Sequence, residues 1–246
     1  FSSLLLSVPE EKLSLILLAN NNLMSNPPRL INGDLRYSLF ALSFLKHYIF
    51  DGEESLPILL SENTLVETSP LPSSPLNQQI ILANALAASF LGQGFPEEQE
   101  KSKALTSALL KQYPEVTEYG NISTLHLLMT LSGSGDDPIF QETMLNLGNH
   151  LLQEQPENPY INIYMAFFYK GQGKAAKAIP YFQTIADAEN YRPFWYTIEA
   201  WYELGIYYQD TQPEIAKAYL QKVVDLGWNI GNKVALAKEA LTVCEE

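Results

Sequence analysis

The alternation of hydrophobic and polar positions predicts a β-hairpin at the start of the chain. Two apolar runs, residues 4–8 and 13–19, fill both alternating sets of positions with mostly apolar side chains. The residues between them, 9–12, contain a proline and three charges and no apolar side chain, which is typical of a turn. We therefore expect two short strands that are buried on both faces.

A helical period follows a polar loop at residues 20–33. Asp34 is suited to cap a helix, because its carboxylate can accept hydrogen bonds from the first free backbone N–H groups. Apolar side chains then recur every three or four residues, at Leu35, Leu39, Leu42, Leu45 and Ile49. Such a stripe predicts a helix with one face that packs on a sheet.

The periodic pattern is interrupted at residues 51–75, where four prolines stand among several serines. This composition is typical of a linker or an extended strap. We therefore place a domain boundary here and expect three parts: residues 1–50, the linker 51–75, and a helical domain at 76–246.

Two consecutive stretches of the helical part share one spacing of bulky and small residues. In the first stretch these positions are Met165, Ala166, Tyr169, Gly173, Ala178, Tyr181, Phe182 and Ile185. In the second they are Trp201, Leu204, Gly205, Tyr208, Ala216, Tyr219, Leu220 and Val223. Each stretch predicts a pair of helices in which small residues allow close approach and bulky ones fill the groove between pairs.

This pattern resembles the tetratricopeptide repeat, W-x₂-L-G-x₂-Y followed by Gly, A-x₃-F-x₂-A and Pro. The second stretch matches better, since the first has Asn162 where the pattern has Trp. Pro180 falls early in the second helix of the first stretch, so we expect that helix to start late or to bend. A degenerate copy near residues 86–114, a poorly fitting pair at 122–156 and a capping helix at 230–241 would complete the array.

The resemblance implies a mainly α fold, an α-α helical repeat superhelix, that binds a protein or peptide along the first helix of each pair. By position the lining residues are Tyr160, Ile163, Phe167, Lys170, Glu199, Tyr202, Ile206 and Gln209. This groove is aromatic and apolar with few cations. The alternative is that the array only packs against a hydrolase domain of its own protein or against a second copy.

The N-terminal segment resembles the C-terminal end of the serine β-lactamase and penicillin-binding-protein-like hydrolases, an α/β domain of which a hairpin and a helix would remain. Residues 26–29, Asn-Pro-Pro-Arg, look like the Asn-Pro-x-Arg that follows the last strand in one branch of that family. The resemblance implies that Asn26 and Arg29 lie at the substrate edge, where a guanidinium can meet a carboxylate. Alternatively, Asn26 and Pro27 form an ordinary turn and Arg29 is solvated.

The same resemblance implies that the Ser-x-x-Lys nucleophile and the rest of the catalytic residues precede Phe1. We therefore expect the chain as given not to be catalytic and to act as a binding or scaffolding module. The alternative is that it belongs to an acyl-serine hydrolase, a β-lactamase, carboxypeptidase or esterase. The resemblance also implies a bacterial periplasm or cell envelope, and the strands suggest possible self-association.

Charge and residue usage exclude several other classes of function. The net charge of −13 and the absence of a Lys/Arg cluster argue against nucleic acid as a partner. The single cysteine, Cys244, excludes an intramolecular disulfide, and the three histidines are widely spaced, so we expect no metal or other cofactor. The apolar runs are shorter than the ~20 residues of a membrane span.

Overall fold

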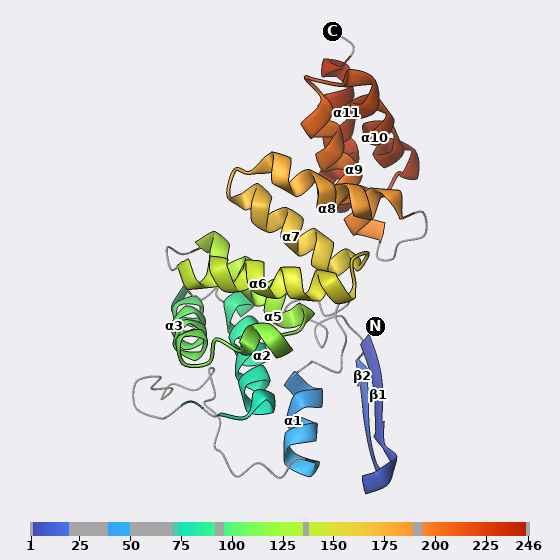
Figure 1. Ribbon diagram of the computed structural model, residues 1–246. Coiled ribbons are helices and arrows are strands. Elements are labelled where there is room, and N and C mark those ends of the chain that lie inside the picture. Colours follow the sequence, from blue (N-terminus) through green and yellow to red (C-terminus); the bar gives the residue numbers. More distant parts are fainter. Residues whose placement is uncertain are drawn as a thin grey trace. The chain divides into compact units, whose positions relative to one another are not determined.

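The computed structural model describes residues 2–19, 39–49, 71, 73–91, 96–134, 138–188 and 194–244. They are mainly helical, with one small two-stranded sheet (Figure 1). Contacts divide the chain into two compact units, Phe1–Leu151 and Leu152–Glu246. The division falls inside a helix. The boundary expected at residues 51–75 falls within unit 1, and most of that segment lies outside the described residues.

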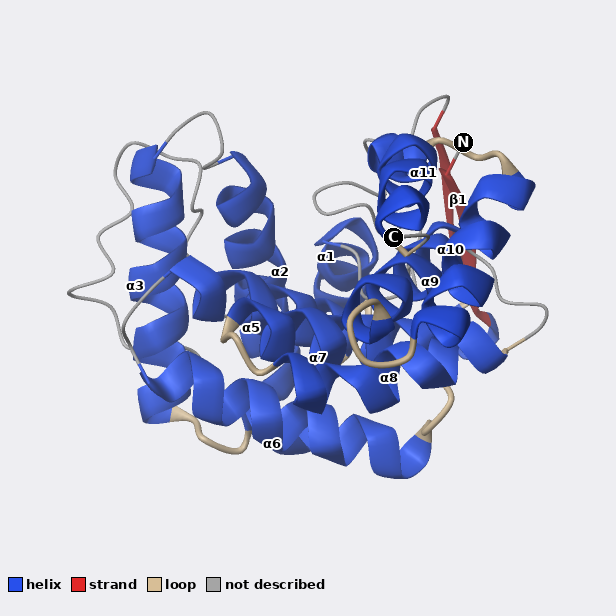
Figure 2. Cartoon of the chain, turned by 90° about the horizontal axis from the view of Figure 1, so that it is seen from above, coloured by secondary structure: helices blue, strands red, loops and turns tan. Residues whose placement is uncertain are grey.

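The predicted hairpin is confirmed. Strands β1 (Ser2–Val8) and β2 (Leu13–Ala19) pair antiparallel, joined by the short 3₁₀ turn η1 (Pro9–Glu11) and by Lys12 in a left-handed conformation (φ 55°). They are the two strands that the described part of the chain contains (Figure 2).

The expected burial of both hairpin faces is not found. Leu5 stands opposite Ile16, and these two side chains and Leu18 are 71%, 64% and 76% exposed. The other face, from Leu4 to Leu17, is half-buried, and none of the hairpin side chains that the structure describes is buried. The sequence pattern shows which positions are apolar, but burial requires a second layer, and no described element supplies one for the exposed face.

Unit 1 contains a group of helices around α2. Its elements are α1 (Leu39–Tyr48), α2 (Pro75–Leu91), α3 (Pro96–Gln112), α4 (Val116–Tyr119), α5 (Ile122–Ser134) and most of α6 (Pro138–Glu154). Helix α2 packs against α1, α3 and α5. Fully buried leucines and isoleucines of these helices, such as Ile81, Leu109 and Leu125, form the core. The predicted cap of α1, Asp34, lies outside the described residues.

Unit 2 consists of consecutive helices, each packed on the next. They are α7 (Pro159–Gly171), α8 (Ala175–Asp187), α9 (Phe194–Tyr208), α10 (Pro213–Leu226) and α11 (Lys233–Val243), which follows the 3₁₀ turn η4 (Ile230–Asn232). In addition, α7 contacts α9, and α9 contacts α11. The two predicted helix pairs and the terminal helix are therefore confirmed.

Local chemistry explains where the helices of unit 2 begin. The Asn158 side chain accepts hydrogen bonds from the backbone N–H groups of Tyr160 and Ile161, which caps α7, and Pro159 occupies the first turn. Asn162 is buried, and its Nδ2 donates to the carbonyl oxygens of Pro156 and Asn158 at 2.8 and 2.9 Å. Asn162, which stands where the expected repeat pattern has a tryptophan, therefore stabilises the start of the helix.

Of the two alternatives expected for α8, a late start or a bend, the late start is wrong. The helix begins at Ala175 and continues through Pro180, which lies inside it. Proline in a helix interior removes one backbone hydrogen bond and costs about 3 kcal/mol. The buried apolar side of α8, with Ala178, Phe182 and Ile185, offsets this penalty.

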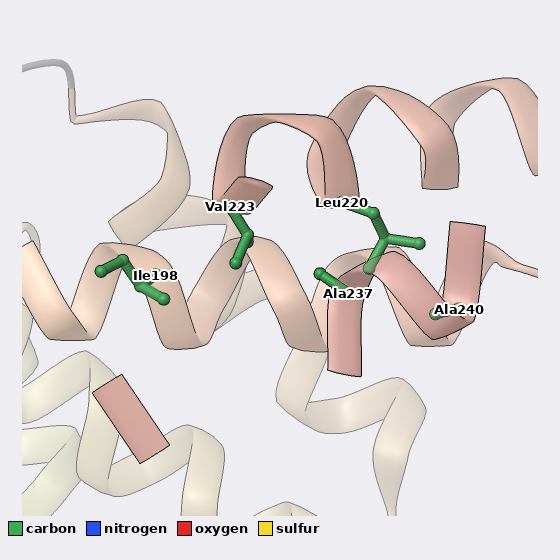
Figure 3. Packing of buried hydrophobic residues seen from close by; sticks show 5 residues of the cluster. All are labelled: Ile198, Leu220, Val223, Ala237 and Ala240. Atoms are coloured by element: carbon green, nitrogen blue, oxygen red, sulfur yellow. The ribbon is translucent and has the colours of Figure 1, made fainter. Parts of the chain in front are cut away.

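One hydrophobic cluster connects α9, α10 and α11. Ile198 from α9, Leu220 and Val223 from α10, and Ala237 and Ala240 from α11 are all buried against one another (Figure 3). The last helix contributes only alanines to the buried set of this cluster.

Candidate functional site

The best candidate site in unit 2 is the surface along α7, α9 and α11, which we call the α7–α9–α11 face. Its charged members come from three different helices: Lys170 from α7, Glu199 and Glu203 from α9, and Lys233 from the first turn of α11. We refer to these four residues as the four-charge cluster. Tyr202 lies beside it on α9.

The four-charge cluster is held by short contacts. Lys170 Nζ lies 2.6 Å from Glu203 Oε1, and Lys233 Nζ lies 2.9 Å from Glu199 Oε1 and 3.7 Å from Glu203 Oε1. The ammonium of Lys233 also stands 4.0 Å from the centre of the Tyr202 ring, within cation–π range. Lys233 therefore has partners on three sides, all of them on α9.

The exposure of these side chains decides their electrostatics. The side chains of Glu203, Lys233 and Glu199 are 10%, 15% and 22% exposed, whereas that of Lys170 is 48% exposed. Burial raises the pKa of Glu199; the hydrogen bond and charge of Lys233 lower it, but by less. The charges cancel within the cluster, and Lys170 is its most accessible member.

Aromatic side chains occupy the other end of the face. The rings of Tyr160 on α7 and Tyr196 on α9 meet edge to face, with centroids 5.5 Å apart. Burial raises the pKa of Tyr164 well above its usual value, and contact with Tyr196 raises it further. Phe167 is half-buried and meets Phe182 of α8 edge to face. Tyr160 and Tyr196 therefore make this end of the face aromatic, whereas the ring of Phe167 packs toward α8.

Contacts between successive helix pairs have a regular separation in the sequence. The pairs Tyr160 with Tyr196, Lys170 with Glu203, Glu199 with Lys233 and Gln183 with Tyr219 are 36, 33, 34 and 36 residues apart. Because early residues of α7 meet early residues of α9, and late ones meet late ones, these two helices run parallel. Helix α11 packs beside α9, and its residue Lys233 comes 34 residues after its contact Glu199.

The predicted lining residues have different exposures. Ile163 is fully buried and is a core residue, so its side chain is not available to a partner. Lys170 and Ile206 are exposed, and the remainder are half-buried, namely Tyr160, Phe167, Glu199, Tyr202 and Gln209. The structure brings Lys170, Glu199 and Tyr202 together at the four-charge cluster. Asn26 and Arg29 lie outside the described residues.

Sequence reasoning missed Glu203 and Lys233, the two other charges of the cluster. A signal was present: Lys170 and Glu203, and likewise Glu199 and Lys233, are opposite charges about one repeat period apart. In a stacked array, positions one period apart become neighbours. A search for opposite charges at this separation would have found both pairs.

The described residues give little support to other chemistry. They contain no group of three or more His, Cys, Asp and Glu side chains placed to hold a metal ion. No described helix has both the length and the apolar character needed to cross a membrane. Ser43 and Lys46 on α1 have the Ser-x-x-Lys spacing, but their side chains lie outside what the structure describes.

Comparison with known proteins adds no relative: no family model, no curated protein and no solved structure matches the chain. The contacts described above therefore carry the argument about function.

Proposed function

We propose that unit 2 is a tetratricopeptide-like array, two helix pairs with α11 as a cap, and that its α7–α9–α11 face binds a protein or peptide. The observation that carries the proposal is the separation of 33 to 36 residues between contacting residues of successive pairs. The tetratricopeptide period is about 34 residues. In unit 1 the first helices of two further pairs, α2 and α5, also pack together, which supports degenerate repeats there.

The chemistry of the face supports an apolar or aromatic ligand. Phe167 and Tyr202 are half-buried, Ile206 is 39% exposed, and the nearby charges neutralise one another. Aromatic and aliphatic anchors surrounded by polar groups are typical of grooves that bind an amphipathic helix or an extended peptide. The partner would place apolar side chains against Ile206 and polar groups near Lys170.

A matched pair of isoleucines tests this proposal. Ile206 on α9 and Ile215 on α10 are 39% and 42% exposed. Peptides selected from a library on the immobilised chain should lose at least about tenfold in affinity with Ile206→Glu, as burying an unpaired charge at an apolar contact is unfavourable. Ile215→Glu should leave affinity unchanged. Equal effects of the two variants, or a library without binders, would contradict the proposal.

As a second candidate, we propose that residues 1–50 are the last elements of a β-lactamase-like hydrolase domain. The antiparallel pairing of β1 and β2, with α1 after them in the chain, supports this. The binding module would then belong to a serine hydrolase, and the substrate edge would include Asn26 and Arg29.

The chain itself is predicted not to react with a penicillin. Ser2 and Ser3 have no lysine three residues later, and acylation needs a serine with an adjacent base. Incubation with a fluorescent penicillin should give no labelled band after denaturing electrophoresis. Stoichiometric labelling would refute this prediction, and a Ser43→Ala variant would then show whether the serine on α1 is the residue attacked.

A further inference from the structure

Helix α11 is attached to unit 2 by small apolar contacts. Its buried side chains in this cluster are alanines, Ala237 and Ala240 (Figure 3). Leu241 and Cys244 are only partly buried. Apolar stabilisation grows with the area removed from water, and an alanine contributes little area. A helix of 11 residues is also too short to be stable alone in water. Packing alone therefore holds α11 weakly.

The start of α11 contains unfavourable local features. Asn232, the residue before the helix, adopts a left-handed conformation with φ of 62°, and its side chain makes no capping hydrogen bond. Gly227 and Gly231 are also left-handed, which glycine adopts without strain. The Asn229 side chain accepts one hydrogen bond from the backbone N–H of Val234. Lys233 then places a positive charge at the first residue of the helix, the end at which the helix dipole disfavours cations.

Polar contacts to α9 offset these features. The Lys233 ammonium meets Glu199, Glu203 and the ring of Tyr202, and its side chain is 15% exposed. Such a desolvated charge is retained only where its partners remain in place. Lys233 is therefore the main polar link between α11 and α9.

We propose that α11 is a hinged lid on unit 2, which opens as one body about residues 227–232 and is held closed by Lys233. Opening uncovers the ring of Tyr202, over which Lys233 lies, and removes Ala237 and Ala240 from the cluster around Ile198. The lid is thus a conformational device, and it does not depend on what the α7–α9–α11 face binds.

Hydrogen exchange on the whole chain tests the lid. In the wild type, the α11 amides should exchange together and faster than those of α9 and α10, because a cooperative local opening exposes one segment at a time. Lys233→Met should accelerate α11 exchange about tenfold or more, since it leaves Glu199 without its closest partner. Lys238→Met, at an exposed position of the same helix, is the matched control and should leave exchange unchanged.

Reversing the charges of the four-charge cluster distinguishes the loss of the ionic link between α9 and α11 from a general loss of folding. The fourfold variant Lys170→Glu/Glu199→Lys/Glu203→Lys/Lys233→Glu keeps every opposite-charge pair of the four-charge cluster and places an acid at the favourable end of the helix, so it should restore slow exchange of α11. Three results would overturn the lid: α11 exchanging as slowly as α9 in the wild type, Lys233→Met accelerating every helix of unit 2 alike, or a charge-reversed variant that fails to restore protection. If Lys233→Met does not fold, the exchange rates of α11 in the wild type and in the charge-reversed variant still test the lid.

Discussion

At the residue scale, Gly205 determines how closely α9 and α10 approach. A Cβ atom at this position would lie 2.6 and 2.7 Å from the Leu220 side chain and 3.4 Å from the carbonyl oxygen of Ala216. Leu220 and Ala216 are fully buried, so neither can move aside without disturbing the core. The sequence pattern had predicted a close approach at these small residues, and the geometry confirms it.

The first prediction is that Gly205→Ala destabilises unit 2. Overpacking of this kind typically costs about 1–3 kcal/mol, which exceeds the gain in helix propensity. The three tryptophans of the chain, Trp195, Trp201 and Trp228, all lie in unit 2, so tryptophan fluorescence during urea unfolding reports this unit. Gly171→Ala is the control: it also lies in a helix, and its Cβ would meet nothing within 4 Å. An unchanged midpoint for Gly205→Ala would show that the contact is not tight.

At the element scale, α7 differs from the expected tetratricopeptide pattern at one position, where a polar side chain stands and the pattern has an aromatic one. Asn162 stands at the place of the leading tryptophan and donates two hydrogen bonds to carbonyl oxygens at the start of α7. Its partners, Pro156 and Asn158, belong to the segment that enters the helix. Asn162 thus joins the turn to the helix and does not fill a groove between pairs.

Asn162→Leu is therefore expected to destabilise unit 2, although leucine is apolar and the site is buried. The variant would leave two carbonyl oxygens with one donor fewer, at a cost of about 1–3 kcal/mol. The change can be measured by the same tryptophan fluorescence. Gln221→Leu, at an exposed position of α10, should have little effect. A more stable Asn162→Leu would mean that the aromatic pattern, and not the hydrogen bonds, decides this position.

Periodicity predicted the helices well, because each helix of unit 2 buries a stripe that its own residues define. It predicted the contacts between helices less well. The late start of α8, one of two alternatives, was wrong because the loss of one backbone hydrogen bond at Pro180 was weighed without the apolar face around it. Ile163 was assigned to the surface, because spacing along α7 does not say how closely neighbouring helices pack. Glu203 and Lys233 were missed, because their contacts appear only after the pairs are stacked.

At the scale of the whole molecule, a partly buried titratable group in each unit makes folding stability depend on pH, with opposite sign in the two units. In unit 1, burial of the ring lowers the pKa of His126 from its usual 6.5 to about 4, although the residue as a whole is half-buried. The unfolded chain then binds a proton at a higher pH than the folded one does. This contribution to stability is therefore full above pH 6.5 and is lost as the pH falls toward 4. In unit 2, the raised pKa of Glu199 acts in the opposite direction: charging it opposes folding as the pH rises above 4.5.

The molecule is accordingly expected to unfold in two steps that separate as the pH is lowered. Between about pH 7 and pH 5, His126 should remove at most about 2 kcal/mol from unit 1. Far-ultraviolet circular dichroism follows both units, and tryptophan fluorescence follows unit 2, so urea curves from the two signals should diverge. In a His126→Leu variant the divergence should shrink. Curves that coincide at every pH would show that the two units unfold as one.

The exposed apolar side chains of the hairpin affect the solubility of the protein. Both strands are short and rich in leucine, and Leu5, Ile16 and Leu18 face away from any described layer. Uncovered, uncharged strands of this kind are nuclei for aggregation, which a high net charge suppresses by repulsion between molecules. The chain has a net charge of −13 at pH 7 and a pI near 4.6. We therefore expect solubility to be greatest well above the pI and precipitation in mild acid to begin at the hairpin.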